Sequence, residues 1–159
     1  MAQCGSLHYK TVAEWVNAQA GHVPYGAVQG GEDSGEPIYV GRANHEGDVI
    51  PGKLHPSHGC VYVPWGGEEH SHTEYQVLVN QHGTILDWIR SSGSEIPTGS
   101  VQGGITADGE TLYIGRTWHE GTVTIGKVHP SHGVLYIAYG GGEHAYPDYD
   151  ILVVRSVNF

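Results

Sequence analysis

The feature that most constrains the fold of this 159-residue chain is an internal duplication. Two segments align at an offset of 73 residues, which becomes 74 after one inserted residue near Asp108. A repeat of about 65 residues has a thin core when it folds alone, so we expect the two copies to share one. The matched letters include VQGG at 28–31 and 101–104, and GKLHPSHG at 52–59 against GKVHPSHG at 126–133.

The pattern of residues in each copy predicts a set of short β-strands separated by tight turns. Runs such as Ile38-Tyr39-Val40 and 76–79 are rich in β-branched and aromatic residues, and Gly, Pro or Asn bounds them. The 25 glycines supply the positive φ angles that tight turns need. We therefore predict an all-β protein: two tandem homologous β-sheet repeats packed about a pseudo-twofold axis, in the manner of a β-sandwich.

The alignment also divides the chain into segments. Trp15 and Trp88 open the two copies, and we assign both side chains to the core. The predicted division is an N-terminal arm at 1–14, a first repeat at 15–79, a linker at 80–87 and a second repeat at 88–155.

Charge excludes two classes of partner. The chain has 7 Lys and Arg residues against 17 Asp and Glu residues, a formal net charge of −10 with histidine neutral. Nucleic acids and anionic membranes both bind basic surfaces, so we expect no nucleic-acid partner. We also expect no membrane insertion, because the apolar runs are only a few residues long.

Two further features bear on localisation. The first residues contain no long apolar segment of the kind found in a secretory signal. Cys4 and Cys60 are too few for a disulfide scaffold, and free thiols in a reducing compartment are the simpler reading. We expect a cytoplasmic protein, or one secreted without a signal peptide in this chain.

Lysine is rare, and two of the three lysines, Lys53 and Lys127, occupy the same position in the two repeats. A lysine in a turn is usually solvated, but in so acidic a chain Lys53 is expected to pair with a carboxylate. Asp33, in the glycine-rich turn before the strand at Ile38, is the natural partner, although an Asx turn also explains it. One fixed donor beside one fixed acceptor suits the vicinal hydroxyls of a sugar.

Two exposed aromatic positions are compatible with the same ligand class. Trp65 and Tyr139 are matched between the repeats, and a Gly-Gly pair follows each. Such rings can stack on the apolar face of a pyranose, or they can pack on the sheet. The sequence leaves both interpretations open.

The 12 histidines suggest the main alternative, a histidine-based metal-binding protein or a metal-dependent enzyme. The spacing in His55-Pro56-Ser57-His58 matches no helical zinc motif, and turn histidines bonded to the backbone explain it better. No Gly-x-Ser-x-Gly elbow or phosphate-binding loop is present. We therefore predict that the protein is not an enzyme and needs no cofactor.

Taken together, the motifs resemble the DM-nine repeat family, here as a tandem pair over residues 15–155. The resemblance implies an all-β tandem fold and a mannose-binding lectin that forms homodimers and acts in innate immune recognition of microbial surfaces. The motifs that carry it are Pro-x-Gly-Ala/Ser-Val-x-Gly-Gly, Tyr-x-Gly-Arg, Gly-Lys-x-His and Gly-Gly-x-Glu-His.

The resemblance also implies site residues. In mannose-binding members, an aspartate in the turn and the lysine of Pro-Gly-Lys hold the sugar, and these positions fall on Asp33 and Lys53. In the second repeat the lysine is Lys127, but Thr106 stands at the aspartate position and Asp108 follows beside the insertion. Asp108 would have to replace the missing carboxylate, or the second site is weakened. Glu69 and His55 are expected near the first sugar.

Overall fold

The computed structural model describes residues 13–156, so Cys4 and nearly all of the expected N-terminal arm lie outside the described residues. The first repeat contains β1 (Glu14–Gln19), β2 (Gln29–Asp33), β3 (Glu36–His45), β4 (Asp48–His55), η1 (Pro56–His58), β5 (Cys60–Trp65), β6 (Glu68–His72) and β7 (Glu74–Val79). The second repeat contains β8 (Ile85–Ser92), β9 (Gln102–Ile105), β10 (Thr111–His119), β11 (Thr122–His129), η2 (Pro130–His132), β12 (Val134–Tyr139), β13 (Gly142–Tyr146) and β14 (Asp148–Ser156). Residues 80–84 connect β7 to β8, so β8 begins inside the segment expected to be a linker.

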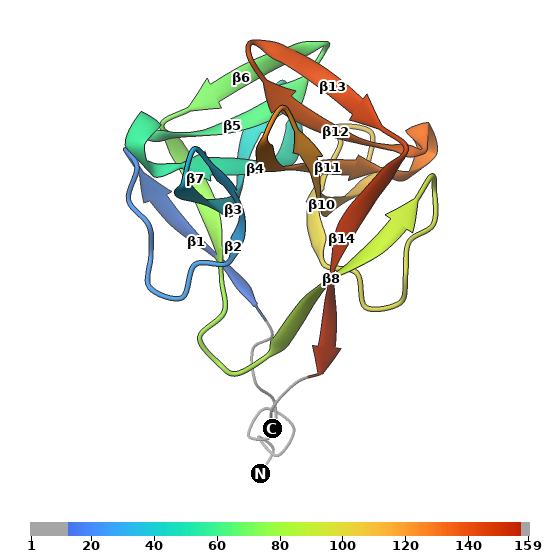
Figure 1. The fold of residues 1–159 in the computed structure, drawn as a ribbon, viewed down its shortest axis with the longest axis horizontal. Coiled ribbons are helices and arrows are strands. Elements are labelled where there is room, and N and C mark those ends of the chain that lie inside the picture. The colour runs from blue at the N-terminus through green and yellow to red at the C-terminus, as the bar shows by residue number, and fades with distance from the viewer. Residues whose placement is uncertain (1–12, 157–159) are drawn as a thin grey trace.

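All fourteen strands join one antiparallel sheet, in the order β1-β7-β3-β2-β11-β12-β13-β6-β5-β4-β9-β10-β14-β8. Exchanging each strand for its counterpart in the other repeat reverses this order, which is the signature of a pseudo-twofold axis. Because β3 also pairs with β4, the eight strands from β3 to β4 in this order close into a ring. Figure 1 shows the two repeats as similar halves, with β6 and β13 meeting above them.

The all-β prediction is confirmed, but the expectation of two separate sheets packed like a sandwich needs correction. The second strand of each repeat pairs with the third strand of its own copy on one side and with the other copy on its other side. Glu32 of β2 lies opposite Val123 of β11, and Ile105 of β9 lies opposite Val49 of β4. These two pairings between repeats join the halves of the molecule through the backbone. Within the described residues, no helix is long and apolar enough to cross a membrane.

The expected shared core is present, but each repeat also has a buried cluster of its own. One cluster of buried side chains belongs to the first repeat and another to the second. A third cluster lies between them, and the half-buried rings of Trp15 and Trp88 pack against it. Its fully or almost fully buried members are Ile38, Val40 and Leu78 from the first repeat and Ile114, Ile125 and Leu152 from the second.

The pairing between repeats explains why a glycine stands at one matched position of both copies, Gly31 and Gly104. A Cβ atom on Gly31 would lie 2.0 Å from the carbonyl oxygen of Val123, and one on Gly104 would lie 2.0 Å from that of Val49. No side chain fits there unless the backbones of the two repeats move apart. The glycine therefore permits the contact that joins the repeats.

Replacing Gly31 by alanine is expected to lower the free energy of unfolding by about 1–3 kcal/mol or more, because the methyl group collides with backbone. Urea denaturation measures the effect. Gly142→Ala is the control, since the nearest atom to its added Cβ is a side-chain atom 3.5 Å away and its φ is not positive. Equal stability of the two variants would contradict the close approach.

Candidate functional site

Lys53 lies on β4, and its side chain is buried between the two repeats rather than solvated in a turn. Only 5% of the residue is exposed. Its Nζ atom is 5.7 Å from the centre of the Tyr62 ring and 5.1 Å from that of Tyr139, which comes from the second repeat. Burial lowers the pKa of Lys53, while the carboxylates of Glu69 and Asp33 oppose that shift. The ammonium therefore occupies a largely dry site with two acidic groups nearby.

Asp33 ends β2, and its direct partner is His55 rather than the predicted Lys53. The Oδ2 atom of Asp33 lies 3.1 Å from Nε2 of His55, and Oδ1 accepts a hydrogen bond of 3.2 Å from the Ser34 hydroxyl. About a quarter of the Asp33 side chain is exposed, against 5% for His55. Asp33 thus stands at the rim of the site and acts on Lys53 through its charge.

His55 is held between two carboxylates. Besides Asp33, Oε1 of Glu36 lies 3.4 Å from its Nδ1 atom, and its ring stacks on His58 at 3.7 Å. Hydrogen bonds from Ser57 help to lower the pKa of Glu36. The predicted turns are present as η1 and η2. The expected bonds from these rings to the backbone are not, because His55 bonds to Asp33 and the ring of His58 to the Tyr62 hydroxyl.

Glu69 lies on β6 and connects the Lys53 site to the other repeat. Its Oε1 atom accepts a hydrogen bond of 3.0 Å from the backbone N–H of Gly141. The counterpart Glu143 accepts one of 2.8 Å from the N–H of Gly67. Each glutamate therefore fastens the Gly-Gly turn of the opposite repeat, and Glu69 also places a negative charge near Lys53.

The second repeat places its lysine differently. Lys127 is also 5% exposed, but its Nζ atom lies 3.4 Å from Oε2 of Glu143, whose side chain is 11% exposed. Burial lowers its pKa, and Glu143 and Asp48 oppose the shift. Among residues 13–156, a carboxylate oxygen lies within 4 Å of the Lys127 ammonium, but none lies within 4 Å of the Lys53 ammonium. The first-repeat ammonium is therefore the one left without a direct carboxylate partner.

Thr106, at the position aligned with Asp33, and Asp108, the expected replacement carboxylate, both lie in the turn after β9. The Thr106 hydroxyl accepts a hydrogen bond of 3.0 Å from the N–H of Glu110, and Asp108 is exposed in the turn between them. Glu110, the counterpart of Glu36, lies 2.9 Å from Nε2 of His129, the ring atom that corresponds to the one Asp33 contacts on His55. Neither Thr106 nor Asp108 is among the groups that shift the pKa of Lys127.

Sequence reasoning missed the aromatic and acidic neighbours that come from the opposite repeat. Tyr139 and Trp65 had been singled out for sugar stacking or packing, and both are partly buried against core clusters. Tyr139 additionally faces the Lys53 ammonium. Nothing in the sequence indicated Asp48, the acidic neighbour of Lys127, because the two residues lie in different repeats and only the pairing between repeats brings them together.

A second histidine cluster joins the end of β3 to β6. Nδ1 of His45 is 3.1 Å from Nε2 of His72, and the His45 ring lies 4.0 Å from that of His70. In the part of the chain that the structure describes, no group of three or more His, Cys, Asp or Glu side chains is arranged to hold a metal ion.

This cluster predicts a loss of stability in mild acid. Burial lowers the pKa values of His45 and His72 below the ordinary 6.5, so the unfolded chain binds protons more readily than the folded one. The contribution of these two histidines to the free energy of unfolding is then fully present above pH ~6.5 and is lost as the pH drops toward their folded pKa values. His72→Tyr copies Tyr146 of the second repeat, whose hydroxyl bonds to His119. Between pH 7.5 and about 5.5, we expect the melting temperature of this variant to fall by less than that of the parent. An equal fall would show that the acid sensitivity does not come from His72.

Comparison with known proteins gives consistent results. A family model described as the DM9 repeat matches residues 32–146. Natterin-4 of Thalassophryne nattereri is 32% identical over 98% of this chain, and natterin-1 of the same species is 28% identical over 95%. The chain spans only 37% and 40% of those relatives. The crystal structure of the nematode sperm cell motility protein MFP2B matches 98% of this chain and 52% of its own, with a TM-score of 0.67 at 16% identity, which shows a shared fold.

Proposed function

The chain belongs to the DM9 repeat family and is distantly related to the natterins, and we propose that it is a non-enzymatic lectin for mannose or mannose-containing glycans. The sugar binds beside Lys53, with Asp33 at the rim of the site. Sugar hydroxyls donate to the Asp33 carboxylate and accept from the Lys53 ammonium. Glu69 and His55 complete the polar surroundings.

The observation that carries the proposal is the difference between the two buried lysines. A buried ammonium is costly unless hydrogen-bond partners surround it. Lys127 has Glu143 at 3.4 Å, whereas among the described residues no carboxylate oxygen lies within 4 Å of Lys53. Hydroxyl oxygens of a bound sugar would supply the missing acceptors. The same difference makes the first repeat the principal site and leaves the second one weak or silent.

Two further parts of the proposal concern the biological setting. Recognition of mannose on microbial surfaces would place the protein in innate defence, and a homodimer would present two Lys53 sites. Paired sites raise avidity for a glycan-covered surface without strengthening either contact.

Retention on mannose-coupled resin in the presence of EDTA tests the lectin class against the metal-dependent alternative. We expect the protein to bind in EDTA and to elute with free mannose, because the proposed site uses only side chains. Binding that requires an added divalent metal, or stoichiometric zinc that survives dialysis, would favour the alternative.

A further inference from the structure

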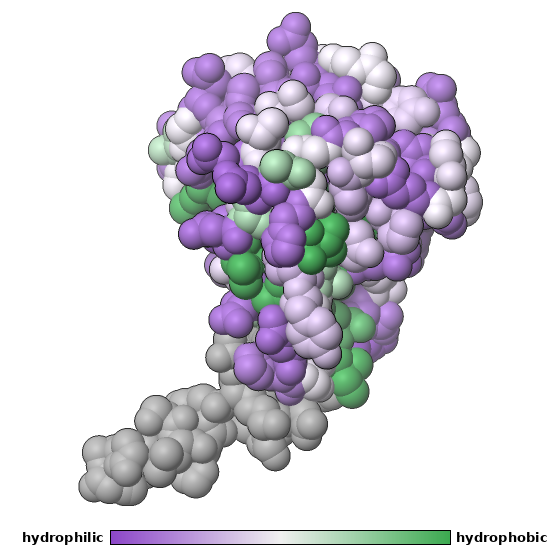
Figure 2. Space-filling model, turned by 90° about the vertical axis from the view of Figure 1, so that its left-hand side faces the viewer, coloured by the Kyte–Doolittle hydropathy of each residue, from purple (hydrophilic) through white to green (hydrophobic). Residues whose placement is uncertain are grey.

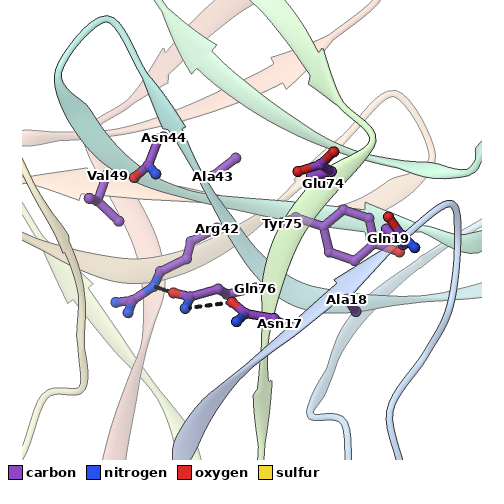
Figure 3. A pocket seen from close by; sticks show the side chains of 10 residues that line it. All are labelled: Asn17, Ala18, Gln19, Arg42, Ala43, Asn44, Val49, Glu74, Tyr75 and Gln76. Carbon is purple, nitrogen blue, oxygen red and sulfur yellow. Dashed lines mark hydrogen bonds between the residues drawn. The ribbon is translucent and has the colours of Figure 1, made fainter.

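The outer face of the first repeat contains a hollow that is separate from the surroundings of Lys53. It has a volume of about 720 Å³, and β1, β7, β3 and the start of β4 form it (Figure 3). Sites for small ligands typically measure ~300–1,000 Å³. Lys53, Asp33 and His55 are not part of its lining. We call this hollow the outer groove.

Strand register builds the floor of the outer groove from a row of polar side chains. Asn17 lies opposite Gln76, and Gln76 lies opposite Arg42. Gln76 donates to Asn17 Oδ1 at 3.0 Å, and Arg42 Nε donates to Gln76 Oε1 at 2.8 Å, as the dashed lines in Figure 3 show. Arg42 is fixed further by a hydrogen bond of 3.3 Å to the carbonyl of Gly103. The floor is therefore a preorganised chain of donors and acceptors.

A second row of side chains supplies the groups of the groove that are free to contact a ligand. Gln19 lies opposite Glu74, and Asn44 lies opposite Val49, which in turn lies opposite the 44%-exposed Ile105. Gln19 and Asn44 are exposed, so their amides can each donate to and accept from a ligand. Val49 provides a small apolar edge to the groove, and Ile105 lies next to it outside the lining.

The charges of the outer groove favour a neutral ligand. Its lining carries one cation, Arg42, and one anion, Glu74. Figure 2 shows the side of the molecule on which β1 and β7 lie, and that side is mainly hydrophilic with small hydrophobic patches. A sugar residue meets these requirements, because its hydroxyls both donate and accept and its C–H groups form an apolar face.

The same place in the second repeat has different chemistry. Arg90 and Asp150 stand where Asn17 and Gln76 stand in the first. Asp150 contacts Arg116 at 3.3 Å and Arg90 at 3.7 Å, so charged groups neutralise one another there. Trp118 replaces Asn44 and is 68% exposed. The fold accepts both sets of residues, and only the first leaves a row of amides.

From this juxtaposition we propose that the outer groove is a second saccharide subsite, which binds a neutral sugar residue of a mannose-containing glycan through the amides of Asn17, Asn44 and Gln76. The inference rests on the proposed function only for the class of ligand. Its residues, strands and charge are independent of the Lys53 site.

The double variant Asn17→Arg with Gln76→Asp tests the inference, because it gives the groove the ion pair of the second repeat. Isotope-labelled protein is titrated with mannopentaose while the side-chain amide signals of Asn44 and Gln19 and the backbone amide signal of Lys53 are followed by NMR. In the parent we expect the groove signals to shift. In the double variant we expect apparent affinity at those signals to fall at least tenfold, with the Lys53 response unchanged. The Lys53→Met variant should show the reverse pattern.

The outcomes separate this inference from the proposed function. Groove signals that stay fixed in the parent, or that shift equally in the double variant, overturn the inference even where the Lys53 signal responds. Groove signals that shift while the Lys53 signal does not respond support the groove and contradict the proposed lectin site.

Discussion

Replacing Lys53 by methionine is expected to weaken mannose binding by about 10- to 140-fold. Hydrogen bonds to charged groups contribute about 1.5–3 kcal/mol, and each 1.4 kcal/mol is about a factor of ten in affinity. Methionine keeps the apolar stem that packs between the repeats and removes the ammonium. Calorimetric titration with methyl α-mannoside measures the loss, and parent affinity in this variant would contradict the site.

Lys127→Met is the matched control because the two lysines are equally buried. Mannose affinity is expected to stay within about threefold of the parent, since Lys127 already has Glu143 as its partner. Its stability is expected to fall further than that of the Lys53 variant, because removing one member of a buried ion pair can cost about 3–5 kcal/mol. A loss of mannose binding in the Lys127 variant would move the principal site to the second repeat.

Replacing Asp33 by threonine is expected to weaken mannose binding by about 10- to 100-fold, because the rim loses its charged acceptor. Threonine is the residue that the second repeat carries at this position, as Thr106. The fold should survive, because His55 retains Glu36 at 3.4 Å. Calorimetric titration and thermal melting measure both effects.

Asp108→Thr serves as the control for that variant, because Asp108 is exposed. It is expected to bind mannose as the parent does. Unchanged binding in Asp33→Thr, or equal losses in the two variants, would show that charge at the rim of the first repeat does not hold the sugar.

The sequence predicted the local parts of the fold because the duplication and its turn residues are local signals. Strands such as 38–40 and 76–79 and the turns at His55-Pro56-Ser57-His58 lie where the sequence places them. The closed ring could not be predicted in this way. It depends on Glu32 pairing with Val123, which lies in the other repeat, and no periodicity within either copy encodes that pairing.

In the candidate site too, the contacts within one repeat were easier to predict than the contacts between repeats. Asp33 and His55 were each expected near the first sugar, and the structure places them in contact, whereas the expected direct pairing of Asp33 with Lys53 is wrong. Tyr139 reaches Lys53 only through the arrangement of the two repeats. The inserted residue near Asp108 left open whether a carboxylate returns to the second site; the structure shows Asp108 exposed and Glu143 paired with Lys127.

Direct observation of the bound sugar tests the central claim most sharply. We expect a crystal structure with methyl α-mannoside to place sugar oxygens within hydrogen-bond distance of Nζ of Lys53 and of the Asp33 carboxylate, with Lys127 still paired to Glu143. A sugar bound only beside Lys127, or one that contacts neither Lys53 nor Asp33, would contradict the account.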